Sequence, residues 1–225
     1  MEVKGKGKLS VSVSTIDMLH AKEWLDFLEK EKVEYLHVDV MDGEFIPSYA
    51  NGVQYIQELR QVTSIPLDIH LMINNPENKL DWFDIQPRES VSIHFESTPH
   101  VQRALEKIRE RGARSMLTLN PATPLYVLED VLDDLDAVSI MTGNPSILGQ
   151  TFVPHTLKKI ERLRKWLDES GHHSIDVEVD GNVTYELAPK MRAAGGDIFV
   201  IGKPYLLHNI EEKEEVLDKI RQFIQ

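Results

Sequence analysis

Short runs of strand-forming residues alternate with longer amphipathic runs along the whole chain. The strand-like runs lie at 9–14, 35–41, 66–73, 90–96, 114–120, 135–142, 174–180 and 197–202. Runs with the hydrophobic spacing of a helix follow each of them, at 17–31, 53–62, 77–85, 100–112, 125–132, 154–171, 185–195 and 210–225. Alternation of this kind predicts parallel strands joined by helical crossovers.

The number of repeats favours a closed barrel over an open sheet. Eight strand–helix units in 225 residues fit a single (β/α)8 TIM barrel better than a doubly wound sheet. No linker, low-complexity segment or change in composition divides the chain, so residues 1–225 are expected to form one α/β domain. In such barrels the active site lies at the C-terminal ends of the strands.

Several predicted strands carry ionisable residues where a core strand would carry apolar ones. The run YLHVDVMDG at 35–43 places His37 and Asp39 two residues apart. Alternate side chains of a strand share one face. The same spacing groups other polar residues on single faces, namely Asp68 with His70, Ser92 with His94 and Glu96, and Asp176 with Glu178 and Asp180. We expect these faces to point into the barrel, near the C-terminal ends of the strands.

So many ionisable groups in one cavity would be costly if they were left unpaired. A divalent cation removes that cost, and two imidazoles with two carboxylates form a suitable shell for Zn²⁺, Fe²⁺, Mn²⁺ or Co²⁺. The best candidate ligands are His37, Asp39, His70 and Asp180. A single core histidine is more often hydrogen-bonded than metal-bound, but this combination at strand ends is hard to explain as structure alone.

Three methionines end predicted strands on the same side as the candidate ligands. Met41, Met72 and Met141 fit two interpretations. They can be ordinary core residues, or they can form an apolar, water-excluding cap beside the metal and contact the substrate.

Composition limits the remaining possibilities. The net charge of −12 argues against a nucleic-acid partner, which would need a basic face. The absence of cysteine excludes disulfides and thiolate metal sites. No apolar run approaches the roughly 20 residues that cross a bilayer, and the first residues lack the apolar core of a secretory signal. We therefore expect a cytoplasmic protein with no membrane association.

Several separate blocks, in order, resemble the ribulose-phosphate 3-epimerase family, which includes the allulose-6-phosphate 3-epimerases. These blocks are HVDVMDGEFIPS at 37–48, LDIHLMINNPE at 67–77, IHFES at 93–97, LNPATPL at 119–125, MTGNPSILGQTFVP at 141–154 and VEVDGN at 177–182. The resemblance covers almost the whole chain. It implies a metal-dependent isomerase that interconverts ribulose 5-phosphate and xylulose 5-phosphate through an enediolate, and a homo-oligomer.

The resemblance also implies roles for individual residues. It places the metal on the same four residues that strand alternation selects, and it assigns Asp39 and Asp180 as the acid–base pair. Ser12 falls at the family's substrate-contacting serine. The expected substrate contacts, including the phosphate end, are Ser12, Met41, Met72, Met141, Gly149, Gly181, Asn182, Gly202 and Lys203.

The phosphate end departs from the family pattern. Asn182 stands where the family usually has glycine, and Lys203–Pro204 replaces a small residue pair. Pro204 removes an N–H donor, and Lys203 adds a cation that can compensate or that simply faces solvent. Ser146 and Leu148 replace two glycines of the loop NPSILGQ. These changes leave open which ketose phosphate is bound, with allulose 6-phosphate as an alternative.

Two further classes remain. Related barrels that catalyse decarboxylation or aldol addition use a lysine within Asp-x-Lys-x-x-Asp, and HVDVMDG has no lysine at that spacing. The other class is a barrel that binds a sugar phosphate without turning it over.

Overall fold

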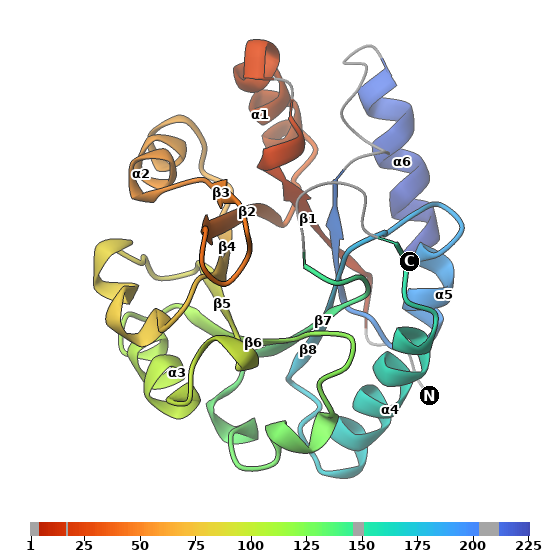
Figure 1. Ribbon diagram of the computed structural model, residues 1–225. Coiled ribbons are helices and arrows are strands. Elements are labelled where there is room, and N and C mark those ends of the chain that lie inside the picture. The colour runs from red at the N-terminus through yellow and green to blue at the C-terminus, as the bar shows by residue number, and fades with distance from the viewer. Residues whose placement is uncertain (1–4, 17, 146–150, 203–211) are drawn as a thin grey trace.

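The computed structural model describes residues 5–16, 18–145, 151–202 and 212–225. Eight parallel strands form a closed barrel (Figure 1). They are β1 (Lys8–Ser12), β2 (Tyr35–Asp42), β4 (Leu67–Met72), β5 (Ser90–His94), β6 (Arg114–Leu119), β7 (Ala137–Met141), β8 (Asp176–Asp180) and β9 (Ile198–Ile201). Strand β1 pairs with both β9 and β2, which closes the ring. The predicted (β/α)8 fold is confirmed.

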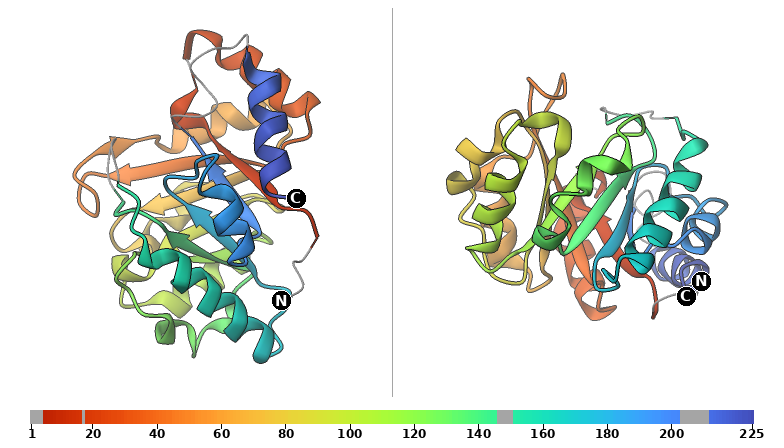
Figure 2. Two further views of the ribbon diagram at one scale, coloured as in Figure 1. Left: turned by 90° about the vertical axis from the view of Figure 1, so that its right-hand side faces the viewer. Right: turned by 90° about the horizontal axis from the view of Figure 1, so that it is seen from below.

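The helices lie outside the ring of strands (Figures 1 and 2). They are α1 (Ala21–Lys30), α2 (Val53–Val62), α3 (Val101–Arg109), α4 (His155–Glu169), α5 (Ala188–Ala193) and α6 (Lys213–Phe223). None of the helices in the described ranges combines the length and apolar character that a membrane-spanning segment needs.

Two of the helices predicted from sequence are wrong in kind. The segment 77–85 contains two 3-10 turns, Pro76–Asn78 and Leu80–Trp82, and the segment 125–132 contains Leu125–Leu128 followed by Leu132–Asp134. In the first case, left-handed backbone at Asn75 and Asp84 ends the helical path on both sides. Each segment is thus divided into two short 3-10 turns and does not form a continuous α-helix.

Alternation along each strand separates two kinds of core. In β2, Leu36 and Val38 are fully buried in the apolar layer between the strands and the helices. His37, one residue on from Leu36, points to the opposite face and is equally buried. The outer layer is therefore hydrophobic, whereas polar side chains fill much of the barrel interior.

The interior has a structural polar cluster at the N-terminal ends of its strands. Oδ2 of Asp176 lies 2.7 Å from Nζ of Lys8 and 2.7 Å from Nη2 of Arg114. Arg114 also donates to the hydroxyl of Tyr35 at 2.9 Å. The expectation that Asp176 lies near the site was therefore wrong. It shares a face with Asp180 but stands four residues lower, about 13 Å along the strand.

A short hairpin extends one side of the barrel mouth. After β2 the chain turns and pairs back through β3 (Tyr49–Ala50), antiparallel to Met41 and Asp42. Oδ1 of Asp42 accepts the N–H groups of Glu44 and Phe45, each at 3.0 Å, and Oδ2 accepts the N–H of Asn74 at 2.9 Å. Asp42 thus ties the loop after β2 to the loop after β4.

Asp42 is expected to stabilise the fold only when it is ionised. Burial alone would raise its pKa, but the N–H of Phe45 and the ammonium of Lys79, 2.9 Å away, help to lower the pKa of Asp42 to about 2. Because this pKa lies below the unfolded value, the stabilisation is full above pH 4 and is lost as the pH falls toward 2.

Asp42→Asn should therefore lower the free energy of unfolding by about 1–2 kcal/mol at pH 7. In urea titrations, the difference in free energy of unfolding between the wild type and the variant should become smaller as the pH falls below 4. Glu44→Gln, a neutralised exposed carboxylate in the same loop, should leave stability unchanged. A difference in free energy of unfolding that stays constant with pH would contradict stabilisation by ionised Asp42.

Candidate metal and active site

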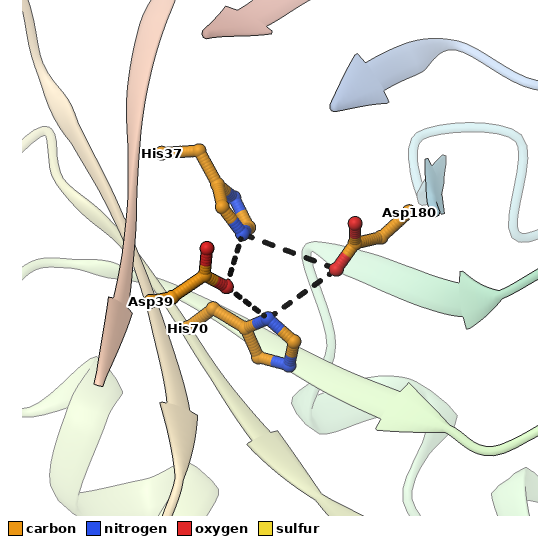
Figure 3. A group of neighbouring side chains, drawn as sticks. All are labelled: His37, Asp39, His70 and Asp180. Atoms are coloured by element: carbon orange, nitrogen blue, oxygen red, sulfur yellow. Dashed lines mark hydrogen bonds and ion pairs between the residues drawn. The ribbon is translucent and has the colours of Figure 1, made fainter. Parts of the chain in front are cut away.

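Three strands bring the four predicted ligands together. His37 and Asp39 come from β2, His70 from β4 and Asp180 from the end of β8. Asp39 lies opposite His70 in the parallel pairing of β2 with β4. On the shorter path around the barrel, β1 and β9 separate β2 from β8. Figure 3 shows Asp39 and Asp180 approaching the same centre from different sides, with His37 and His70 between them.

The ligand atoms of the four residues converge within 4.8 Å of one another. Nε2 of His37 lies 3.2 Å from Oδ1 of Asp39 and 3.9 Å from Oδ2 of Asp180. Nδ1 of His70 lies 3.3 Å from the same two oxygens. Each imidazole therefore presents one nitrogen to the two carboxylates (Figure 3).

These residues fit a divalent transition metal. Nδ1 of His70 is buried, faces two carboxylate oxygens and makes no well-aligned hydrogen bond. Such an orphaned nitrogen is costly unless a cation uses its lone pair. Two imidazoles and two carboxylates also match the ligand preferences of Zn²⁺, Fe²⁺, Mn²⁺ and Co²⁺.

The electrostatics of the cluster favour positive charge. Burial alone would lower the pKa of His37, but Asp39 and Asp68 raise that pKa well above its ordinary value. Burial alone would raise the pKa of Asp39, but His37 and His70 hold the pKa of that carboxyl far below its usual range. Asp39 is thus held ionised, and its negative charge favours a cation at this centre.

A buried polar layer supports His37 from below. Asp68, which faces His37 across the β2–β4 pairing, accepts from Nδ1 of His37 at 2.8 Å and from the Ser10 hydroxyl at 2.6 Å. Glu178 lies beside it, and burial together with the Asp68 charge raises the pKa of Glu178 well above its ordinary value. His37, Asp68 and Glu178 also group closely enough to hold an ion. However, the hydrogen bonds of Asp68 already occupy one of its oxygens, so we interpret this layer as support.

A second imidazole lies beside His70. Nε2 of His94 is 2.8 Å from Nε2 of His70, and Nδ1 of His94 is 3.4 Å from Oε2 of Glu96. Burial lowers the pKa of His94 to about 4. The ring of Phe45 packs against His94 with 4.8 Å between the ring centres. The sequence placed His94 and Glu96 on the interior face but gave them no role.

The predicted substrate-contacting residues lie around the cluster where they are described. The hydroxyl of Ser12 is 3.4 Å from Oδ2 of Asp39. Met72 and Met141 are buried, and Met41 is half-buried. Gly181, Asn182 and Gly202 follow β8 and β9 at the same end of the barrel. Gly149 and Lys203, with Ser146, Leu148 and Pro204, lie outside the described residues.

Asn182 adopts the left-handed backbone that glycine favours, with φ 49°. Asparagine tolerates this conformation better than most residues, which explains how it can stand where the family usually has glycine. Its side-chain Nδ2 is buried and makes no hydrogen bond to another described group. A donor is therefore available at the predicted phosphate end.

Two supporting residues at this end of the barrel were not found from the sequence. Nδ2 of Asn51 donates to the carbonyl of Asp39 at 3.0 Å, and the N–H of Thr142 donates to the carbonyl of Asp180 at 2.7 Å. Both bind the backbone carbonyl of a candidate ligand residue. The pairing of Met141 with Asp180 places Thr142 beside this turn, and only the strand register could have revealed it.

The fold and the cluster together define a (β/α)8 barrel with a two-histidine, two-carboxylate centre at the C-terminal ends of its strands. A model of the ribulose-phosphate 3 epimerase family matches residues 8–206. The chain belongs to this family, as the motifs predicted.

Curated relatives agree with the family assignment. The chain is 35% identical over 214 residues to ribulose-phosphate 3-epimerase of Bacillus subtilis, covering 95% of this chain and 98% of the relative. It is 41% identical over 201 residues to the chloroplastic ribulose-5-phosphate-3-epimerase of Arabidopsis thaliana, covering 88% and 71%.

Solved structures with low identity show the fold alone. The 3-keto-L-gulonate-6-phosphate decarboxylase of Vibrio cholerae matches with a TM-score of 0.68 at 10% identity, over 98% of both chains. The orotidine 5'-monophosphate decarboxylase of Sulfolobus solfataricus matches with a TM-score of 0.65 at 10% identity, over 97% of this chain and 98% of the other.

Proposed function

We propose that this protein is a metal-dependent 3-epimerase that interconverts ribulose 5-phosphate and xylulose 5-phosphate. Family membership and the names of the curated relatives support the reaction and the substrate. The observation that carries the proposal is the meeting of Asp39 and Asp180, from well-separated strands, at one buried centre with two imidazoles.

The reaction inverts the carbon next to a ketone, and this requires two acid–base groups. One group removes the C3 proton from one face, and the other returns a proton to the opposite face of the planar enediolate. We assign these roles to Asp39 on β2 and Asp180 on β8, which exchange them when the reaction runs in reverse. A proton taken by one carboxylate can then be lost to solvent before the next turnover.

His37, Asp39, His70 and Asp180 would hold the divalent metal. When bound, the metal supplies positive charge beside the substrate oxygens on which negative charge develops. The side chains of this chain orient the two carboxylates, and the buried methionines Met72 and Met141 exclude water from their surroundings. The Ser12 hydroxyl, near Asp39, is available to contact the substrate.

The phosphate is proposed to bind after β8 and β9, near Gly181, Asn182, Gly202 and Lys203. Barrels of this kind commonly hold phosphate with the loops that follow their seventh and eighth strands. The unpaired buried Nδ2 of Asn182 supports this placement.

Lys203→Ser should raise the KM for ribulose 5-phosphate several-fold and leave kcat nearly unchanged, because the phosphate is remote from C3. Steady-state kinetics with each epimer would measure this. Lys190→Ser, a change of the same type on helix α5, serves as the control. Unchanged KM and kcat would identify Lys203 as a surface lysine.

One experiment separates the proposed function from its rivals. A panel of ketose 5- and 6-phosphates is incubated in heavy water with metal-loaded protein and followed by NMR. We expect deuterium at C3 and formation of the C3 epimer, fastest with ribulose 5-phosphate. Faster exchange with allulose 6-phosphate would reassign the substrate. Binding without exchange on any ketose phosphate would identify a sugar-phosphate-binding barrel instead.

A further inference from the structure

We propose that Glu96 and His94 are positioning residues that determine which nitrogen of His70 faces the metal. The inference rests on the metal site proposed above, but it concerns a relay of polar contacts that begins outside the ligand set and ends at His70. In this relay, Glu96 sets the tautomer of His94, and His94 in turn sets the tautomer of His70.

The relay starts at the contact between the two imidazoles. Their Nε2 atoms are 2.8 Å apart, the ring centres are 5.0 Å apart, and the ring planes differ by 20°. The facing nitrogens therefore lie between the two ring centres, as an N–H···N hydrogen bond requires. Such a bond contains one proton, so one nitrogen donates and the other accepts.

Glu96 decides which of the two nitrogens donates. Oε1 of Glu96 accepts the N–H of Asn120 at 3.0 Å and the hydroxyl of Thr123. Oε2 faces Nδ1 of His94 at 3.4 Å, a charge contact rather than a hydrogen bond, and this nitrogen makes no hydrogen bond among the described residues. The negative charge of Glu96 beside Nδ1 favours the proton of His94 on this nitrogen, since a carboxylate can only accept.

The proton on Nδ1 leaves Nε2 of His94 as an acceptor. His94 is fully buried beneath Phe45, so a neutral ring with a single proton suits its surroundings. The shared proton therefore belongs to Nε2 of His70. In the metal-loaded protein, Nδ1 of His70 is then the bare nitrogen, and it is the one that points at Asp39 and Asp180.

The two ligand histidines are consequently anchored in opposite ways. His37 donates from Nδ1 to Asp68 and presents Nε2, whereas His70 donates from Nε2 to His94 and presents Nδ1. Partners that orient a ligand histidine typically change metal affinity about 10–100-fold when they are altered. The relay through His94 should have an effect of this size.

Two substitutions of Glu96 separate positioning from a structural role. In Glu96→Gln, the side-chain carbonyl of the glutamine takes over the bonds to Asn120 and Thr123. The NH2 group of the same amide then faces Nδ1 of His94. That donor forces His94 to carry its proton on Nε2, and His70 must then carry its own on Nδ1, where the metal binds. Glu96→Ala removes the acceptor without adding a donor, so both tautomers of His94 remain accessible.

We therefore expect Glu96→Gln to weaken Zn²⁺ binding by about 10–100-fold, and Glu96→Ala to weaken it less. Competition with a chelating dye measures the affinity without any use of activity. Glu129→Gln, on the exposed connection between β6 and β7, makes the same charge change away from the relay and should bind Zn²⁺ like the wild type. A merely structural role predicts the reverse order, because Gln preserves the shape of Glu and Ala does not. That order would overturn the proposal.

A measurement on the wild type gives an independent answer even if a variant does not fold. In the Zn²⁺-loaded protein, ¹⁵N NMR should show protons on Nε2 of His70 and Nδ1 of His94. Coordination through Nε2 of His70 would overturn the relay. If the wild type failed to bind Zn²⁺, the metal site would be wrong, and ¹⁵N NMR of the metal-free protein would still test the first step of the relay: a proton on Nε2 rather than Nδ1 of His94 would overturn it.

Discussion

Asp39→Asn and Asp180→Asn should each reduce kcat for epimerisation by about 10²–10⁴-fold and leave the fold intact. Asparagine has nearly the shape of aspartate and retains a carbonyl oxygen for the metal, but it cannot take up or return a proton at C3. Because inversion needs both carboxylates, losing either one should stop net conversion in both directions.

Turnover measured from each epimer, with circular dichroism and Zn²⁺ affinity on the same samples, tests this expectation. The affinity measurement distinguishes a lost acid–base group from a lost metal. Asp218→Asn on the exposed side of α6 controls for the removal of a carboxylate and should behave like the wild type. Near-normal turnover in either site variant would refute the two-carboxylate mechanism.

Removal of the metal should abolish epimerisation as completely as loss of a carboxylate. Protein treated with a chelator and dialysed should regain activity with Zn²⁺, Fe²⁺, Mn²⁺ or Co²⁺, because geometry rather than affinity selects among ions for this ligand set. Addition of metal should also raise the thermal midpoint, since an ion that binds only the folded state stabilises it.

The thermal shift provides the control for this experiment. His70→Ala deletes a ligand and should weaken the shift at low metal concentration. Full activity in chelator-treated protein, confirmed as metal-free by elemental analysis, would contradict the assignment of the cluster as a metal site.

The fold and the convergence of the four candidate ligands were predictable because both depend on periodicity alone. Eight alternations of strand and helix fix a parallel barrel. The two-residue spacing of His37 and Asp39 fixes a common face, and position at the strand end brings His70 and Asp180 to the same mouth.

Periodicity does not show how far along the barrel axis a residue lies, nor whether a helical segment forms α or 3-10 turns. Asp176 shares a face with Asp180 yet belongs to an ion cluster at the opposite end. The segments 77–85 and 125–132 have helical spacing but fold as 3-10 turns, which hydrophobic spacing alone does not distinguish from an α-helix.

The supporting contacts also escape a sequence reading, since they depend on the register between strands. Asp68 supports His37 because the pairing of β2 with β4 sets these two residues side by side. His94 reaches His70 from the next strand, and Glu96 reaches His94 only after β5 has ended in a 3-10 turn. Spacing within one strand contains none of this information.

The central claim is that Asp39 and Asp180 act on opposite faces of the same carbon, and exchange half-reactions test it most directly. Metal-loaded Asp39→Asn and Asp180→Asn are incubated separately with ribulose 5-phosphate and with xylulose 5-phosphate in heavy water. Each variant should exchange the C3 proton of one epimer only, without inversion, and the two variants should select opposite epimers. Loss of exchange from the same epimer in both variants, or exchange from both epimers in either one, would contradict the account.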